Sequence, residues 1–120
     1  MKETKSTNSE LIRLIRFLKK EGRKKEASIW RDLAAHLAKP RQGRAVVNLS
    51  RINRYAQKND AVVVPGKLLG TGVLDHPLTV AAFAVSEKAK EKLRTAKAEY
   101  LSIQELVEKN PKGSNVKIIR

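Results

Sequence analysis

Residues 61–85 read AVVVPGKLLGTGVLDHPLTVAAFAV, and this stretch decides the fold. Short apolar runs that are bounded by turn signals predict buried strands, so we expect one strand at Ala61–Val64 and another at Thr79–Val85. Pro65 has no backbone N–H to donate and is expected to close the first strand. A glycine loop, residues 66–72, is expected to follow.

Further elements are predicted on both sides of these strands. Ser86 is expected to cap a helix that runs to about Lys97, and Ser102–Glu105 has the spacing of a capping box before another helix. A last strand is expected at Val116–Ile119. On the N-terminal side, Ala45–Val47 is expected to form a short strand that leads into a short helical turn.

The N-terminal residues show helical periodicity. Apolar residues at helical spacing predict one helix over about Ser9–Lys20, with Gly22 as its stop, and a second over about Lys25–Ala38, which Pro40 cannot continue. Each helix has an apolar stripe beside basic residues. A membrane-surface helix is one interpretation of that pattern, but burial of the two stripes against each other explains both, so we expect a helical hairpin.

These elements predict an α/β fold in which a helical N-terminal hairpin precedes a mixed core of strands and helices. With 120 residues, of which 41% are hydrophobic, the chain fits a single domain spanning 1–120. We divide it into a helical N-terminal arm (1–38), a basic loop with a short helix (39–60) and a mixed α/β core (61–120).

The composition restricts the classes of partner. Lysine and arginine total 26 against 12 acidic residues, which gives a formal net charge of +14 and favours a polyanion such as nucleic acid. The chain has no cysteine, so a disulfide framework and a thiolate metal site are excluded. It also lacks a long uninterrupted apolar run, so no membrane partner is expected.

The most basic segment, residues 39–58, contains six lysines and arginines and no acidic residue. Arginine can donate two hydrogen bonds at once to phosphate oxygens, and interleaved neutral side chains suit contacts to phosphate and sugar. A solvated basic surface is the alternative. The candidate nucleic-acid-binding residues here are Lys39, Arg41, Arg44, Asn48, Ser50, Arg51, Asn53, Arg54, Tyr55 and Lys58. Outside this segment we add Lys67 in the glycine loop, and Arg13 and Arg16 on the first helix.

A catalytic interpretation depends on the two histidines. His36 and His76 are the only ones, and Asp75 is the only carboxylate next to either in sequence, so no triad is visible. The glycine loop is not a phosphate-binding motif, because its last glycine is followed by Val73 and Leu74 rather than by a lysine and a serine or threonine. We therefore expect no enzyme activity, no metal, no cofactor and no small-molecule substrate, and we keep an acid–base ribonuclease as an alternative.

Long stretches of the sequence resemble one ribosomal protein family, the archaeal branch of large-subunit protein eighteen of the eukaryote-type series. The resemblance covers nearly the whole chain and is carried by residues 4–18, 29–33, 47–54, 63–70, 76–83 and 110–120. The family is related to bacterial large-subunit protein fifteen. The resemblance implies an irregular superhelical core of strand, strand and helix units.

The same resemblance implies a function. It implies a structural constituent of the large ribosomal subunit that binds folded large-subunit rRNA beside neighbouring ribosomal proteins, in the cytoplasm and without a cofactor. The RNA-facing elements that it implies are the loop Lys39–Arg44, the segment Asn48–Arg54 and the glycine loop around Lys67. A free-standing nucleic-acid-binding protein, such as a chromatin-like or RNA-processing factor, is the alternative.

Overall fold

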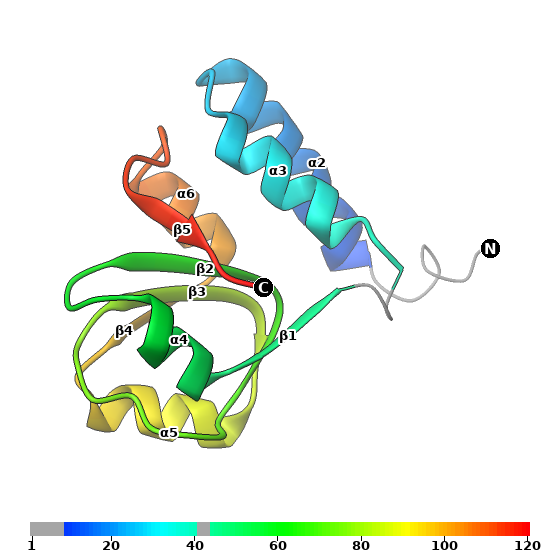
Figure 1. The fold of residues 1–120 in the computed structure, drawn as a ribbon. Coiled ribbons are helices and arrows are strands. Elements are labelled where there is room, and N and C mark those ends of the chain that lie inside the picture. Colours follow the sequence, from blue (N-terminus) through cyan, green and yellow to red (C-terminus); the bar gives the residue numbers. More distant parts are fainter. Residues whose placement is uncertain (1–8, 41–43) are drawn as a thin grey trace.

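A computed structural model describes residues 9–40 and 44–120. Within these residues the chain forms five helices and five strands in an α/β arrangement, with two helices ahead of the first strand (Figure 1). Their bounds are α2 Ser9–Lys24, α3 Ser28–Leu37, β1 Ala45–Asn48, α4 Leu49–Tyr55, β2 Ala61–Leu69, β3 Thr79–Val85, α5 Glu87–Thr95, β4 Glu99–Leu101, α6 Ile103–Lys109 and β5 Val116–Ile118. The expected α/β class, with helices before the strand core, is confirmed.

The strands form one sheet in which β2 is central. One edge of β2 pairs with β3, which in turn pairs with β4, and the other edge pairs with β5 and then with β1 farther along the strand. All of these pairs are parallel. Parallel neighbours need crossover connections, and α5 supplies the one between β3 and β4. α6 follows β4 and leads to β5, which pairs with β2.

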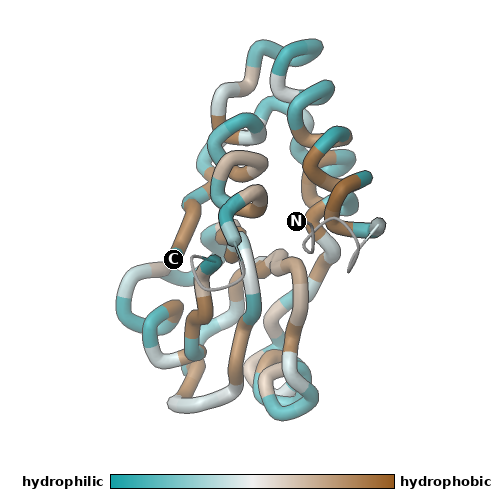
Figure 2. The backbone as a smooth tube through the Cα atoms, turned by 90° about the vertical axis from the view of Figure 1, so that its right-hand side faces the viewer, coloured by the Kyte–Doolittle hydropathy of each residue, from teal (hydrophilic) through white to brown (hydrophobic). Residues whose placement is uncertain are grey.

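Two apolar layers cover the two faces of the sheet. Side chains alternate between the faces of a strand, so Val62 and Val64 of β2 pack with α4 and α5, whereas Val63 packs with α2, α3 and α6. In Figure 1, α5 lies on the opposite side of the sheet from α6 and the hairpin. Figure 2 shows hydrophobic segments inside this arrangement and hydrophilic turns on its outside.

The prediction that β2 ends at Pro65 is wrong. The strand continues to Leu69, with an irregularity in its register to β3 between Val64 and Lys67. The missing N–H of Pro65 is tolerated at such an irregularity because the ladder is already interrupted there. Gly66 lies opposite Ala45, and a Cβ on Gly66 would fall 2.0 Å from the Ala45 carbonyl oxygen, so β1 approaches closely only because residue 66 is glycine.

The hairpin also differs from its predicted bounds. Gly22 does not stop α2, which extends to Lys24, and α3 begins three residues later than expected, at Ser28. Gly22 is buried against α3, where a Cβ would lie 2.7 Å from Cγ of Arg31. The apolar stripes of both helices are buried, as expected. No helix in the described part of the chain has the length and hydropathy needed to cross a membrane.

The predicted helix starts in the core are confirmed. The Ser86 hydroxyl accepts a hydrogen bond from the backbone N–H of Ala89 and caps α5. Ser102 and Glu105 form the reciprocal bonds of a capping box at α6. A last strand follows at Val116–Ile118, one residue shorter than predicted.

Candidate nucleic-acid interface

A cleft of about 740 Å³ opens where α3, β1, α4 and β5 meet beside the centre of β2. Pro65 of β2 lies in its wall, between the part of β2 that pairs with β5 and the part that pairs with β1. Among the described residues no strand pairs with β2 at that position on this edge, since the pairing with β5 ends at Val63 and the pairing with β1 begins at Gly66. The polar side chains lining the cleft are His36, Lys39, Arg51, Tyr55, Lys117 and Arg120.

The Tyr55 ring and the Arg51 guanidinium are two flat groups that lie against each other in the lining of the cleft, and we call them the planar pair. They lie one turn apart on α4, and the Arg51 guanidinium carbon is 5.1 Å from the centre of the Tyr55 ring, within the range of a cation–π contact. Arg54 approaches the same ring at 6.0 Å. Arg51 Nε also donates a hydrogen bond of 2.9 Å to the main-chain oxygen of Arg120, which restricts the position of its guanidinium. The Tyr55 side chain is nevertheless well exposed.

The cleft is cationic. None of the described residues that line it is acidic, whereas four are lysine or arginine. Of these, Lys117 is paired with a carboxylate, since its Nζ lies 2.8 Å from Oδ2 of Asp60. Lys39 and Arg120 make no ion pair with the described residues. Since Arg51 is hydrogen-bonded to Arg120, the side-chain charges of Lys39 and Arg120 are the two that an anionic partner meets without a competing ion pair among the described residues.

Burial and the positive charge around the cleft lower the pKa of His36. Partial burial lowers the pKa of the imidazole below its ordinary value of 6.5, and the positive charges of Arg120 and Lys39 lower it further. The nearby carboxylate of Asp32 acts in the opposite direction but has the smallest effect. Lys39, just after α3, and Arg120, just after β5, thus both act on the His36 imidazole.

The structure brings part of the predicted site together. Lys39, Arg51 and Tyr55 line the cleft, and Arg54 and Lys58 are exposed on or just after α4. Ser50 is also exposed, on the first turn of α4. Arg41 lies outside the described residues.

Three of the predicted contacts are less accessible than we expected. Nε of Arg44 and Oδ1 of Asn48 are buried and have no hydrogen-bond partner within residues 9–40 and 44–120. Asn48 precedes α4, but its side chain makes no capping bond. Oδ1 of Asn53 accepts the backbone N–H of Asp75 at 3.1 Å, so this side chain holds the loop before β3 in place.

The remaining predicted residues lie away from the cleft. Lys67 is exposed, but it belongs to β2 rather than to a loop, because the strand runs through the first part of the glycine loop. Arg13 and Arg16 are exposed on α2, and Arg13 lines a different groove together with Phe17 and Phe83. These three basic residues therefore do not belong to one compact site with Arg51.

Sequence reasoning missed His36, Lys117 and Arg120 as parts of the basic site. Lys117 and Arg120 lie far from the segment 39–58 in sequence and reach it only because β5 packs beside α4, whereas His36 lies just before the segment and was left out because it adds no charge to the basic run. One signal was available for Lys117. It lies between Val116 and Ile118 in a predicted strand, and period-2 alternation places such a residue on the exposed face.

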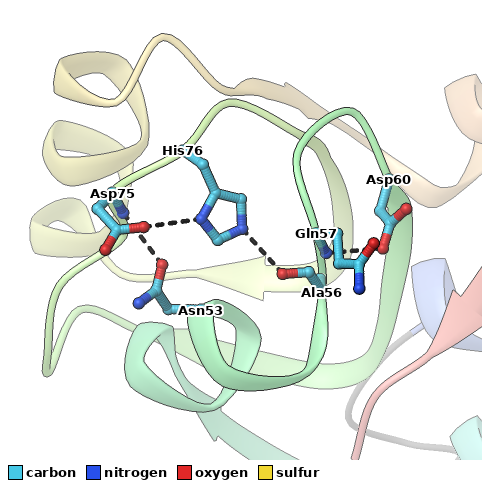
Figure 3. A network of polar contacts seen from close by, with 6 residues as sticks. All are labelled: Asn53, Ala56, Gln57, Asp60, Asp75 and His76. Atoms are coloured by element: carbon cyan, nitrogen blue, oxygen red, sulfur yellow. Dashed lines mark hydrogen bonds and ion pairs between the residues drawn. The ribbon is translucent and has the colours of Figure 1, made fainter.

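The second histidine has a different environment. His76 Nδ1 lies 2.8 Å from Oδ1 of Asp75, and Nε2 lies 2.9 Å from the carbonyl oxygen of Ala56, as Figure 3 shows. The hydrogen bond with His76 lowers the pKa of Asp75. Both ring nitrogens are thus engaged within the fold, and the ring connects the loop before β3 to the end of α4.

Neither histidine belongs to a metal site in the described structure. No group of three or more histidine, cysteine, aspartate or glutamate side chains in these residues is arranged to hold a metal ion. His36 lines the cleft, whereas Asp75 and His76 do not. The three residues of the catalytic interpretation are therefore not gathered around this cleft.

Comparison with known proteins gives a consistent result. The family model described as "Ribosomal protein 60S L18 and 50S L18e" matches residues 1–120. "Large ribosomal subunit protein eL18" of Methanoregula boonei is 50% identical over 114 residues, which cover 95% of this chain and 94% of the relative. Proteins of the same name from Archaeoglobus fulgidus and Methanothermobacter thermautotrophicus are 46% and 45% identical, over 96% and 94% of this chain and 98% and 93% of their own. With the whole chain matched by the family model, this protein belongs to the family of ribosomal protein 60S L18 and 50S L18e.

Proposed function

We propose that this chain is a structural constituent of the large ribosomal subunit, where it binds folded large-subunit rRNA beside neighbouring ribosomal proteins. The relatives named as large ribosomal subunit proteins support this function. The observation that carries it is the cationic cleft between α3, α4 and β5, which has no acidic lining residue among those described. A ribosomal constituent of this kind resides in the cytoplasm.

The proposed recognition is of phosphate and shape. Lysine and arginine side chains neutralise backbone phosphates, and neutral donors such as Ser50 meet phosphate or sugar oxygens. Structured RNA offers these groups in a fixed arrangement, so a rigid cationic surface selects a folded RNA with few base-specific contacts. The exposed residues Arg54 and Lys58 extend this surface beyond the cleft.

We further propose that the chain acts as a single domain. The cleft takes His36 from the predicted N-terminal arm, Arg51 from the basic segment and Lys117 from the predicted core. Because the cleft is built from all three parts of the chain, we expect the three parts to bind RNA together and not as separate modules.

We propose no enzymatic role and no cofactor. An acid–base ribonuclease needs ring nitrogens that are free to exchange protons with RNA. Both nitrogens of His76 lie within hydrogen-bond distance of oxygens of the fold, which argues against that use. RNA turnover that is measurable in the native protein and lost in a His76→Ala variant would contradict this proposal.

Fractionation tests the ribosomal function against the free-standing alternative. Lysate from the protein's own cells is separated on a density gradient, and the large subunits are then washed at rising salt. We expect the native chain in the large-subunit fraction, remaining there at salt concentrations that remove proteins bound only by charge. A chain found mainly in light fractions, or on DNA, would support a chromatin-like or RNA-processing protein instead.

A further inference from the structure

We propose that the cleft binds one unpaired nucleotide that projects from folded RNA, with its base against the Arg51–Tyr55 pair and its phosphate among the lining cations. This inference rests on the proposed function and specifies the RNA feature that the same site recognises. A helical backbone would need only an exposed basic surface, whereas this molecule has a hollow next to an aromatic ring. Three features of the cleft suit such a nucleotide: its volume, the planar pair and the positions of its charges.

The volume is suited to a nucleotide. Sites for small ligands occupy about 300–1,000 Å³, and the cleft has about 740 Å³. Its walls include Ala45, Pro65, Ile118 and Ile119, which offer apolar surface to a base. The duplex backbone of an RNA helix is too wide to enter such a hollow, so the feature that enters must be extruded from the helix.

The Arg51–Tyr55 pair is suited to a base. Unpaired RNA bases stack on aromatic rings and on guanidinium planes, and this cleft has one of each in contact at 5.1 Å. Tyr55 remains 53% exposed, although aromatic rings are usually buried, so a large part of its surface is available to a partner. The hydrogen bond from Arg51 to Arg120 holds the guanidinium before RNA arrives, which reduces the conformational entropy lost on binding.

The charges are suited to the phosphate of the same nucleotide. Lys39 and Arg120 line the cleft without an ion pair to the described residues, and both act on the pKa of His36. Their positive charges therefore act on one region of the cleft, around His36, and Arg120 is also in contact with Arg51 of the planar pair. An extruded nucleotide has the matching arrangement, because its base and its phosphate are joined through one sugar.

Two RNA hairpins that differ only in whether one adenosine of the stem is paired or bulged provide the test. Because stacking is tolerant of sequence, a model hairpin is a suitable probe. We expect the native protein to bind the bulged hairpin roughly tenfold more tightly than the paired one, from the usual size of base–aromatic stacking. Equal affinity for the two hairpins would overturn the proposal.

Variants at two tyrosines test whether the preference for the bulged hairpin comes from the cleft. Tyr55→Phe keeps the ring and should keep the preference, whereas Tyr55→Leu should lose it and bind the two hairpins with equal affinity. Tyr100→Leu is the matched control, because Tyr100 is an exposed tyrosine on β4, at the opposite edge of the sheet from β1 and β5. A preference that survives in Tyr55→Leu, or that Tyr100→Leu also removes, would contradict the assignment of the cleft.

Adenosine monophosphate distinguishes RNA from a free nucleotide. We expect it to displace the bulged hairpin only at far higher concentration than the hairpin itself, since it lacks the other backbone contacts. Displacement at similar concentration would make the cleft a site for free nucleotides and would overturn the proposal. Failure of any of these results would leave the fractionation result unchanged, so this inference and the ribosomal function fail separately.

Discussion

The indole Nε1 of Trp30 donates a hydrogen bond of 2.7 Å to the carbonyl oxygen of Pro111. Trp30 lies on α3 and is completely buried, while Pro111 belongs to the connection between α6 and β5. The bond therefore joins the helical hairpin to the segment that leads into β5. Because α3 and the β5 segment both supply residues to the cleft, this bond joins two of the elements that form it.

Trp30→Phe should destabilise the protein. The smaller ring leaves a cavity in the core and removes the donor to Pro111, and together these effects cost about 2–4 kcal/mol of unfolding free energy. Urea denaturation followed by far-UV circular dichroism measures the change, with Tyr100→Phe at an exposed site as the control. An unchanged urea midpoint in Trp30→Phe would show that the hairpin does not depend on this contact.

Gly66→Ala should separate β1 from β2. The new Cβ would lie 2.0 Å from the carbonyl oxygen of Ala45, which is backbone and cannot rotate away. We expect a loss of about 2 kcal/mol or more of unfolding free energy, because one strand must shift. Hydrogen exchange should show weaker protection of Val47, whereas α5 amides should change less. Native protection at Val47 in the variant would mean that the sheet accommodates the methyl group.

His36 should take up a proton when RNA binds. In the free protein, burial and nearby cations hold its pKa below 6.5, so the folded state binds fewer protons near that pH than the unfolded state does. The stability of the free protein should therefore fall as the pH decreases through this range. An RNA phosphate in the cleft favours the imidazolium and raises the pKa again.

The measurement is RNA affinity between pH 7.5 and 5.5, with His36→Gln as the comparison. We expect the native protein to gain affinity on acidification and the variant to show a weaker dependence. The His36 ring resonances, followed by NMR, should titrate at higher pH in the complex than in the free protein. Identical pH dependences in the two proteins would place the phosphate elsewhere.

Asp60 should contribute stability at neutral pH that is lost in acid. The backbone N–H of Gln57 and then the ammonium of Lys117 lower the pKa of Asp60 from its ordinary value of 3.8. The contribution is therefore present above that value and disappears as the pH falls through the lowered one. Asp60→Asn should reduce the urea midpoint at pH 7, and the difference from the native protein should shrink in acid. Glu108→Gln, at an exposed carboxylate, is the control.

Much of the fold was predictable because it depends on local patterns. The strand Thr79–Val85 was predicted with the bounds that the structure has, and the caps at Ser86 and Ser102 correctly mark the starts of α5 and α6. The failures have tertiary causes. Gly22 stays helical because α3 packs against it, and β2 passes Pro65 because other strands pair with β2 before and after that residue.

The candidate site was less predictable. The run of basic residues indicated Lys39, Arg51 and Tyr55, because charge density is visible in one segment of sequence. Lys117 and Arg120 could not be assigned in this way, since they join the cleft only through the pairing of β5 with β2. Whether Arg54 and the other exposed residues contact RNA stays a prediction.

Charge variants on two faces test the central claim, that the surface around the cleft binds large-subunit rRNA. The first triple variant replaces Lys39, Arg54 and Lys58 with glutamine, and the second replaces Lys88, Arg94 and Lys112, which are also exposed but lie outside the cleft. Both remove three positive charges. Binding to transcribed rRNA is measured over a salt series, with DNA duplex of equal length as the competitor.

The account predicts that the first variant loses affinity for rRNA and has a salt slope smaller by about two, since each lost phosphate contact lowers the slope by about 0.7–0.9. The second variant should bind nearly as the native protein does, and both the native protein and the second variant should prefer rRNA to DNA. Equal weakening by the two variants, or native binding to DNA as tight as to rRNA, would contradict the account, because net charge alone would then explain the association.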